Sequence, residues 1–532
     1  MKNVYYNLTL KRKLSSGDIY GDAAARHVAH SSAFLYGQSI ITALSGFVFW
    51  YYATKVTSPS FVGEVSSLYL LSSLASTLLT FSVPSVVQRY IPMYEARGEK
   101  EASVFVARLL VAAGLAISMA VFAFIYFLAG PLSYYFLKSE NQAFLLRYFS
   151  FSVFFGLLSA FFSGLLVAHQ KFRLYSMINS VYFTCYYMLA LITLWKMRSL
   201  TGVIIAWTAT NLAFLMAFAA LSVPYLKGRA RRIEVKPMIR YGIPLYASNI
   251  VSYGSSLIDR YVVLFLSTLS SLGIYNIAIS SSGVITSLLS AALSVTYPYL
   301  SGLFGRNDAK RMKLVVRLTV KYMTVAFVPL AIGASVIAYP VLSLFGTGEY
   351  TAGTVPLATV LILSAISLPG GIYANALLAQ GKSHKILVGS AASLAANVAI
   401  SAALIGPLGI EGAALGLSSS SVAYFGVMAY YAARAGVFGF DATAAWKSWL
   451  SSLGMGAIVM GCEIALRSVI FIPVYVLLGA AVWLLMMREL RPLDESDAKL
   501  IEQIVPAGTR GILEHLLSFL RVREEELSSQ PA

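Results

Sequence analysis

Long runs of apolar residues recur along almost the whole chain, from Phe34 to Met487. A helix that crosses a membrane needs about 20 such residues, and these runs lack the alternating pattern of a membrane β-barrel. With 58% hydrophobic and only 12% charged residues, a soluble fold of this length would leave much apolar surface in water. The sequence therefore predicts an all-α, polytopic membrane protein with about 14 transmembrane helices. The predicted spans are residues 34–55, 62–83, 105–129, 143–167, 175–195, 202–222, 243–267, 273–297, 315–338, 355–379, 386–405, 411–432, 448–466 and 469–487.

Lysine and arginine residues are divided unevenly between the two sides of these spans. Of the 40 in the chain, 33 belong to the amino-terminal segment, the even-numbered connections, the span ends beside these connections and the carboxy-terminal tail. Positive residues near span ends stay in the cytoplasm, so both termini are expected there. The net charge of +17 reflects the excess of these basic residues over aspartate and glutamate. Because the basic residues lie beside predicted membrane spans, we expect membrane lipids rather than nucleic acid as the partner of the protein.

Several short segments of the first half recur about 210 residues later in the chain. The paired segments are Phe61-Val62-Gly63-Glu64 with Ser271-Leu272-Gly273-Ile274, Arg108-Leu109 with Arg317-Leu318, Val167-Ala168-His169-Gln170-Lys171 with Leu378-Ala379-Gln380-Gly381-Lys382, and Thr201-Gly202-Val203 with Glu411-Gly412-Ala413. Parallel repeats are a known plan of transporters, and we expect two six-helix lobes with the substrate held between them, followed by two added helices. The expected segments are a cytoplasmic N-terminal leader (1–33), an N-lobe (34–223), a basic cytoplasmic linker (224–242), a C-lobe (243–433), the last two spans (434–488) and a cytoplasmic tail (489–532).

A line of polar residues follows one face of the seventh predicted span. Asn249, Ser252, Ser256 and Asp259 are three or four residues apart, which places them on the same face of a helix. Arg260 follows directly, and a charged side chain inside a membrane is costly enough to need a reason. The stripe favours a water-filled cavity. A structural role, as an internal salt bridge or a helix–helix contact, stays open for the same residues.

Weaker polar signals accompany this stripe. Asn276 opens a similar series in the eighth predicted span, and Gln38 opens one in the first. Arg89 stands at the predicted cytoplasmic end of the second span, either at a cavity entrance or as an ordinary positive-inside anchor. The sequence has no phosphate-binding glycine loop, and its two cysteines and five histidines form no metal-ligand pattern. We therefore expect no cofactor, no metal site and no enzymatic activity.

Four groups of residues resemble the motifs of a known transporter family. They are Phe61-Val62-Gly63, Gln88-Arg89-Tyr90-Ile91-Pro92 with Ala96-Arg97-Gly98-Glu99, Ile258-Asp259-Arg260, and Leu272-Gly273-Ile274-Tyr275-Asn276-Ile277-Ala278. Together they resemble the polysaccharide-flippase branch of the multidrug/oligosaccharidyl-lipid/polysaccharide exporter superfamily, over about residues 34–487. The resemblance implies an alternating-access bundle that moves a polyprenyl-phosphate-linked oligosaccharide from the cytoplasmic to the outer leaflet. It also implies a multi-pass protein of a prokaryotic plasma membrane that serves cell-surface polysaccharide or glycoprotein biosynthesis.

The resemblance also suggests roles for the charged pair. Arg260 is expected to bind the diphosphate of the lipid carrier, because a guanidinium stays charged and offers forked donors to phosphate. Asp259 then either holds Arg260 in place or binds a coupling cation, Na⁺ or H⁺. A cation-coupled multidrug exporter of the same superfamily is the alternative, although spans one to six contain only Glu64 as an acidic residue. A membrane-embedded glycosyltransferase is less favoured, because the predicted external loops are too short for a catalytic site.

Overall fold

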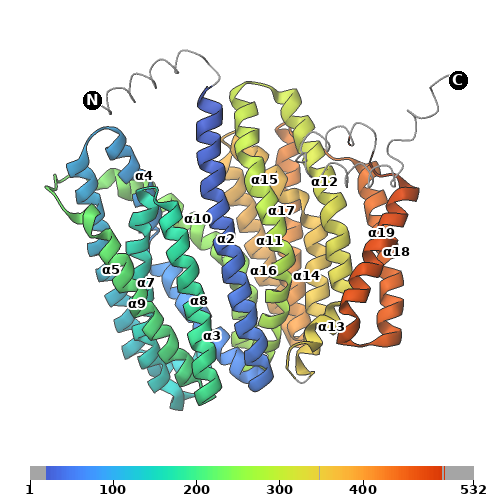
Figure 1. The fold of residues 1–532 in the computed structure, drawn as a ribbon, viewed down its shortest axis with the longest axis horizontal. Coiled ribbons are helices and arrows are strands. Elements are labelled where there is room, and N and C mark those ends of the chain that lie inside the picture. The colour runs from blue at the N-terminus through green and yellow to red at the C-terminus, as the bar shows by residue number, and fades with distance from the viewer. Residues whose placement is uncertain (1–18, 347, 494–496, 498–532) are drawn as a thin grey trace. The chain divides into compact units, whose positions relative to one another are not determined.

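A computed structural model describes residues 19–346, 348–493 and 497 of the chain. Within these residues every regular element is a helix, which confirms the all-α prediction (Figure 1). The start of the predicted leader, and all of the predicted tail beyond 493 except residue 497, lie outside the described residues. The helices of the first half are α2 Ile19–Val56, α3 Pro59–Leu79, α4 Val83–Ala96, α5 Lys100–Phe127, α6 Ala129–Leu137, α7 Ala143–Ala168, α8 Phe172–Met197 and α9 Leu200–Leu226, with a 3₁₀ turn η1 at Glu140–Gln142. Those of the second half are α10 Lys236–Leu266, α11 Leu269–Gly305, α12 Ala309–Val336, α13 Ala338–Ser343, α14 Thr354–Ser367, α15 Pro369–Ala379, α16 Ser383–Leu408, α17 Ile410–Arg434, α18 Ala442–Leu466 and α19 Ile472–Leu490, with 3₁₀ turns η2 at Glu349–Gly353 and η3 at Val469–Phe471.

Eleven helical segments in the described part of the chain are long and apolar enough to cross a membrane. They coincide with eleven of the predicted spans, whereas the first, seventh and eighth predicted spans fall on α2, α10 and α11. These three helices are also the ones to which the sequence analysis assigned polar residues. The polytopic membrane fold is therefore confirmed, while the number fourteen stays a prediction.

Two of the predicted spans are interrupted. The second, 62–83, is interrupted near its end, where α3 stops at Leu79 and α4 begins at Val83, because Phe81 and Ser82 both have the left-handed backbone conformation, with φ 48° and 54°. Pro84 then stands in the first turn of α4, where the missing N–H would have had no helical partner. The tenth is divided between α14 and α15 at Leu368, directly before Pro369, which supplies no N–H to continue the helix. A proline therefore follows both interruptions, in the first turn of the next helix.

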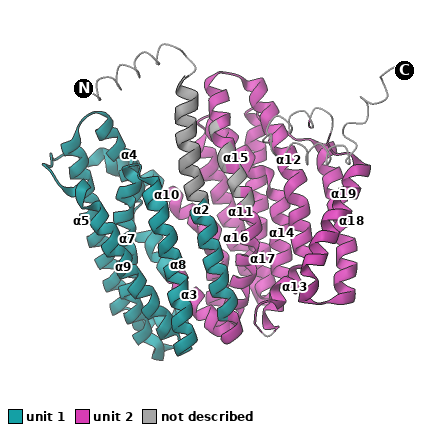
Figure 2. Ribbon diagram, viewed as in Figure 1, with its two compact units in different colours: residues 1–53, 72–246 teal, residues 54–71, 247–532 magenta. Residues whose placement is uncertain are grey.

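The chain forms two compact units (Figure 2). Unit 1 comprises the chain up to residue 53 and residues 72–246, and unit 2 comprises residues 54–71 and the chain from 247 onwards. The first part of α3 thus packs with the second half of the sequence. The predicted lobe and linker boundaries stay predictions.

Each unit has its own apolar core. In unit 1 this core lies among α4, α5 and α7, where Leu110 and Phe161 are buried. In unit 2 it lies among α12, α15, α17 and α18, where Tyr373, Met428 and Met455 are buried. In each unit the helices therefore bury apolar side chains against one another.

Large apolar side chains also cover much of the outer surface of these helices. Phe127 is 79% exposed, Ile470 is 81% exposed and Leu477 is 71% exposed. A soluble protein rarely exposes extended apolar surface, whereas a helix in lipid satisfies its backbone internally and needs apolar side chains outside. This surface supports the membrane fold.

The order of the helices repeats along the chain. The starts of α5 and α12, at Lys100 and Ala309, are separated by about 210 residues, which is the period of the sequence repeat. The starts of α6 and α13, and those of α9 and α17, are separated by the same interval to within one residue. The sequence repeat is therefore also a repeat of secondary structure, whereas the superposition of the two six-helix lobes stays a prediction.

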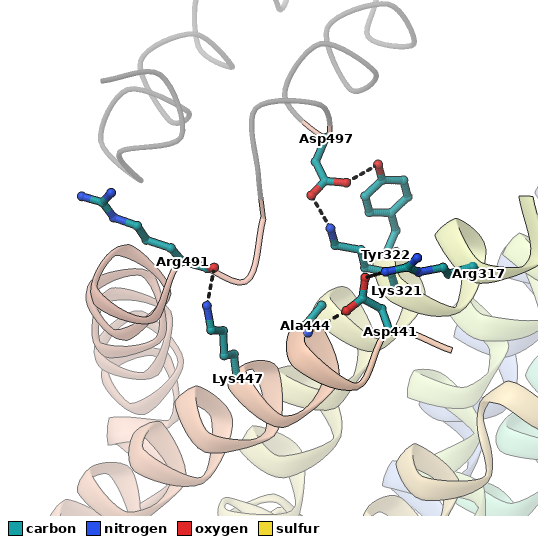
Figure 3. Close-up of polar contacts among 8 residues, drawn as sticks. All are labelled: Arg317, Lys321, Tyr322, Asp441, Ala444, Lys447, Arg491 and Asp497. Atoms are coloured by element: carbon teal, nitrogen blue, oxygen red, sulfur yellow. Dashed lines mark hydrogen bonds and ion pairs between the residues drawn. The ribbon is translucent and has the colours of Figure 1, made fainter. Parts of the chain in front are cut away.

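A polar cluster in unit 2 connects α12 and α18 with the segment after α19 (Figure 3). Asp497 accepts hydrogen bonds from Lys321 Nζ at 2.5 Å and from the Tyr322 hydroxyl at 2.8 Å, and the ion pair with Lys321 is almost fully buried. Arg317 pairs with Asp441 at 2.8 Å, and the Asp441 carboxylate also caps the first turn of α18. Burial opposes ionisation of Asp441, but the helix cap and Arg317 outweigh it and lower the pKa of this carboxyl. These contacts hold Asp497 against α12.

Candidate functional site

The polar stripe of the seventh predicted span lies on α10, in unit 2. Asn249, Ser252 and Ser256 are exposed, and the Ser256 hydroxyl donates to the carbonyl oxygen of Ser252 at 2.9 Å. Asp259, about one turn further, is fully buried. The stripe therefore changes from an exposed polar face to a buried carboxylate along a single helix.

The Asp259 carboxylate receives a hydrogen bond from the next helix. The Tyr275 hydroxyl on α11 donates to Asp259 Oδ2 at 2.7 Å, and Tyr275 is itself fully buried. Asp259 Oδ1 is also buried and has no hydrogen-bond partner among the described residues. Burying an acceptor without a partner is costly, so Oδ1 is an atom that can accept a proton or ligate a cation.

Arg260 is half-buried on the same helix. Its Nε is a buried donor that has no hydrogen-bond partner within the described part of the chain. The described residues show no ion pair between Asp259 and Arg260, consistent with the different directions in which consecutive side chains leave a helix. The internal salt bridge considered from the sequence is therefore not formed, and the Arg260 Nε donor is available to a ligand.

Two glycines bring α3 and α11 close together near this carboxylate. A Cβ built on Gly273, two residues before Tyr275, would meet the carbonyl oxygen of Pro59 and lie 2.9 Å from the backbone nitrogen of Gly63. A Cβ on Gly63 would in turn meet the carbonyl oxygen of Leu269. Only glycine fits this crossing without a shift of the backbone.

Two tyrosines extend the same packing to α10. The Tyr261 hydroxyl donates to the carbonyl oxygen of Leu70 on α3 at 2.8 Å and lies 2.6 Å from the Tyr253 hydroxyl. These hydrogen bonds and the glycine crossing make α3, α10 and α11 one packed group around Asp259. The Asp259 carboxylate therefore lies among packed helices rather than on a loop.

The other predicted residues lie in three places. Asn276 is buried on α11, directly after Tyr275. Gln38, on α2 in unit 1, has a buried Oε1 with no hydrogen-bond partner among the described residues. Arg89 is exposed on α4, also in unit 1, and its guanidinium carbon lies 4.1 Å from the centroid of the Tyr241 ring. Six of the eight predicted residues thus belong to α10 and α11, and two belong to the other unit.

Tyr275 is not among the site residues predicted from the sequence. A signal for it exists, because α10 and α11 are consecutive antiparallel helices joined at Ser267 and Thr268. Asp259 lies eight residues before Ser267 and Tyr275 lies eight residues after it, which places the two opposite each other. An antiparallel pairing of the seventh and eighth predicted spans therefore predicts the contact between Asp259 and Tyr275.

Comparison with known proteins places this fold in a family. The sequence profile of the polysaccharide biosynthesis protein family matches residues 28–304, more than half of the chain. The chain therefore belongs to the polysaccharide biosynthesis protein family. Among curated proteins, no sequence match was found.

Solved structures of membrane transporters share the fold. The lipid II flippase MurJ in an inward closed conformation is 17% identical, with a TM-score of 0.68 over 86% of this chain and 98% of that chain. An inward-facing multidrug resistance MATE family transporter of the MOP superfamily is 13% identical, with a TM-score of 0.62 over 74% and 94%. A mutant of the Vibrio cholerae MATE transporter VcmN is 15% identical, with a TM-score of 0.54 over 77% and 98%. At these identities the likeness shows the fold alone.

Proposed function

We propose that the protein is a flippase that moves a polyprenyl-(di)phosphate-linked oligosaccharide from the cytoplasmic to the outer leaflet by alternating access. The observation that carries this proposal is membership of the polysaccharide biosynthesis protein family over residues 28–304. The fold, which resembles that of a lipid II flippase along most of both chains, supports it. The product would serve cell-surface polysaccharide or glycoprotein biosynthesis.

Arg260 is the residue proposed to bind the diphosphate of the lipid carrier. Its buried Nε has no hydrogen-bond partner among the described residues, so a donor is free without breaking an existing contact. A guanidinium keeps its charge and matches phosphate oxygens with forked donors. The exposed polar atoms of Asn249, Ser252 and Ser256 on the same helix would provide contacts to a hydrophilic headgroup.

Asp259 is proposed to serve the coupling cation, Na⁺ or H⁺. Its free Oδ1 is buried beside the half-buried Arg260, while Tyr275 fixes the other oxygen. Among the described residues no group of three or more His, Cys, Asp or Glu side chains could hold a metal ion. A Na⁺ ion would therefore take its other ligands from neutral oxygens, and a proton would need Asp259 alone.

We also propose a location and a class for the protein. Both termini face the cytoplasm, and the membrane is the plasma membrane of a prokaryote, as the distribution of lysine and arginine and the family resemblance suggest. The protein acts as a transporter rather than an enzyme, with membrane lipids and the lipid-linked oligosaccharide as its partners and no nucleic acid.

A cation-coupled multidrug exporter is the second candidate, since MATE transporters share the fold. Among residues 37–53 and 72–246 of unit 1, no aspartate or glutamate is buried as a coupling acid of the first half would be. The family match also points to polysaccharide biosynthesis rather than to drug export. The flippase is therefore the function that the observations support best.

The test is a transport assay with substitutions at Arg260. Full-length protein is reconstituted in vesicles with a fluorescent polyprenyl-diphosphate oligosaccharide, and flipping is measured as access of an impermeant quencher. Arg260→Ala should lower the rate on the order of tenfold or more, because hydrogen bonds to charged groups contribute about 1.5–3 kcal/mol. Arg260→Lys should retain an intermediate rate, since a point charge replaces a planar fork.

Arg229→Ala is the matched control, because it removes the same charge from an exposed position of the linker between α9 and α10. It should flip at the wild-type rate. If Arg260→Ala, present at normal abundance, also keeps that rate, Arg260 has a structural role only. Transport of a cationic drug without flipping of the lipid-linked sugar would instead favour the exporter.

A further inference from the structure

The turn between α11 and α12 in unit 2 contains a pocket of about 200 Å³. Tyr299, Gly302, Leu303, Arg306 and Arg311 line it. The pocket therefore combines two guanidinium groups with an aromatic ring and a backbone that a glycine leaves open. It is separate from the Asp259 site on α10.

The charge of this turn is strongly positive. Arg306 and Arg311 are exposed, and Lys310 and Lys313 are exposed next to them on the first turns of α12. The one acidic residue of the turn, Asp308, uses its carboxylate as a helix cap, accepting a hydrogen bond from the Arg311 backbone N–H at 2.9 Å. The described side chains thus leave both guanidinium groups facing the pocket without an acidic partner in the turn.

The turn also lies where a lipid headgroup would be found. α12 begins at Ala309 and is long and apolar enough to cross a membrane. Leu314, about one turn after Arg311 on α12, is 52% exposed, while Tyr299, which is 51% exposed, is a ring of the kind enriched at membrane surfaces. Basic side chains beside such apolar side chains are typical of a protein segment at the interface.

We propose that this pocket binds the phosphate group of an anionic membrane lipid. Two guanidinium groups offer forked donors that match phosphate oxygens. The exposed Leu314 would contact the acyl chains. This inference does not depend on the transported substrate, so it stands or falls separately from the proposed flippase activity.

The equivalent turn of the first half provides a comparison. Arg97 and Arg306 occupy the same place in the repeat, each as the residue that directly follows a helix, α4 in one case and α11 in the other. In the first half the acidic residue of the turn, Glu99, forms an ion pair with Arg231 of the linker, and the Arg231 backbone N–H donates to the carbonyl oxygen of Glu101. The turn of the first half thus contacts the linker, whereas Arg306 and Arg311 line an open pocket.

The test compares phosphatidylglycerol binding among charge-matched variants of the full-length protein. Native mass spectrometry of detergent-purified protein gives the dissociation constant of the first phosphatidylglycerol, with phosphatidylcholine as the zwitterionic lipid. The double variant Arg306→Gln, Arg311→Gln should weaken phosphatidylglycerol binding on the order of tenfold or more, since hydrogen bonds from a charged group contribute about tenfold each. Lys310→Gln, Lys313→Gln and the single Arg97→Gln should weaken it less than about threefold, because these residues lie outside the pocket.

Inorganic phosphate separates the two sources of the ligand group. Phosphatidylglycerol should bind in the presence of millimolar phosphate, and phosphate alone should bind no differently to wild type and to the double arginine variant. Equal losses in the arginine and lysine double variants would show a diffuse charge effect and overturn the pocket. Equal binding of phosphatidylcholine, or an arginine-dependent site that phosphate alone fills, would overturn the lipid assignment.

Discussion

The side chain of His169 is only 8% exposed at the C-terminal end of α7 in unit 1, between Glu95 and Tyr225. Its Nδ1 lies 2.8 Å from Glu95 Oε1, its ring stacks on Tyr225 at a centroid distance of 3.9 Å, and its Nε2 is buried with no hydrogen-bond partner among the described residues. Burial lowers the pKa of His169, although Glu95 acts in the opposite direction. The folded protein therefore favours the neutral imidazole.

This environment predicts a pH dependence of stability. A histidine in the unfolded chain has a pKa of about 6.5, and because the folded pKa is lower, the unfolded state binds more protons below that pH. The contribution of His169 is therefore fully present above about pH 6.5 and is lost as the pH falls. The thermal unfolding midpoint should drop between about pH 7.5 and 5.5, and His169→Gln should flatten this drop.

The repeat supplies the reason for choosing glutamine. Gln380 is the residue that follows α15, as His169 is the residue that follows α7, and its amide donates to the carbonyl oxygen of Ala435 at 3.5 Å. A neutral amide is thus accommodated at this place in the other unit. His384→Gln on α16 is the control, because His384 is exposed. An unchanged pH profile in His169→Gln, with the same profile in the control, would contradict the assignment.

At this scale the sequence identified the charged residues but not their partners. Asp259 and Arg260 stand out because charge is rare in apolar runs. Whether they pair depends on side-chain direction, and the structure turns Asp259 towards Tyr275 instead of Arg260. Polar residues spaced at the helical period of 3.6 likewise predict a shared helix face, but this spacing does not show which part of the face neighbouring helices bury. The sequence therefore did not predict that Ser256 is exposed whereas Asp259 is buried.

Among the helices, the crossing of α3 and α11 depends on two glycines that the sequence repeat also pairs, Gly63 and Gly273. A methyl group on Gly273 would meet backbone atoms, which cannot move aside as a side chain can. Gly273→Ala should therefore destabilise the protein by about 1–3 kcal/mol, measured as a lower unfolding midpoint. The test is thermal unfolding of the purified protein.

Gly283→Ala on the same helix is the matched control. A Cβ there would meet no atom within 4 Å, and replacing an exposed helical glycine by alanine contributes up to about 1 kcal/mol of stability. The two substitutions, identical in chemistry, should thus shift the midpoint in opposite directions. Similar shifts would show that backbone entropy, rather than the crossing, decides the effect.

Helix boundaries were predictable where proline or a change of polarity marks them. Pro369 marks the break between α14 and α15, which the predicted span 355–379 missed, and the basic turn at Arg306 marks the end of α11, eight residues beyond the end of the predicted span 273–297. The helix α4 was not predictable from apolar length, because it is short and amphipathic and buries only Val86, Val87, Tyr90 and Ile91. Its start needs the left-handed Ser82, and no local rule demands that conformation of serine.

For the whole molecule, the repeat was predictable because it needs only a comparison of the sequence with itself. Equivalent helices begin about 210 residues apart, as the sequence period predicts. The boundaries of the two compact units were not predictable from the sequence. They depend on contacts between segments far apart in the chain, such as the first part of α3 and α11, which are about 200 residues apart in sequence. Whether the repeats are parallel in the membrane is a question of sidedness, which lysine and arginine counts predict.

Two pairs of repeat-equivalent residues test that sidedness. Glu101 and Lys310 are the second residues of α5 and α12, and Glu140 and Glu349 are the first residues of η1 and η2. All four are exposed. A parallel repeat places the two members of each pair on the same side of the membrane, whereas an inverted repeat places them on opposite sides.

The measurement is labelling of single cysteines by an impermeant maleimide in intact cells, with Cys185 and Cys462 replaced by alanine. Cysteines at Glu140 and Glu349 should react in intact cells, because they lie in connections predicted to be external and poor in lysine and arginine. Cysteines at Glu101 and Lys310 should react only after permeabilisation, with equal labelling of all four in detergent as the control for reactivity. Labelling that divides either pair would exclude the parallel repeat. If instead the cysteines at Glu101 and Lys310 react in intact cells and those at Glu140 and Glu349 do not, the repeat is still parallel but both termini face outside. The repeat interval determines which residues share a side of the membrane, whereas only the distribution of basic residues predicts which side is the cytoplasm.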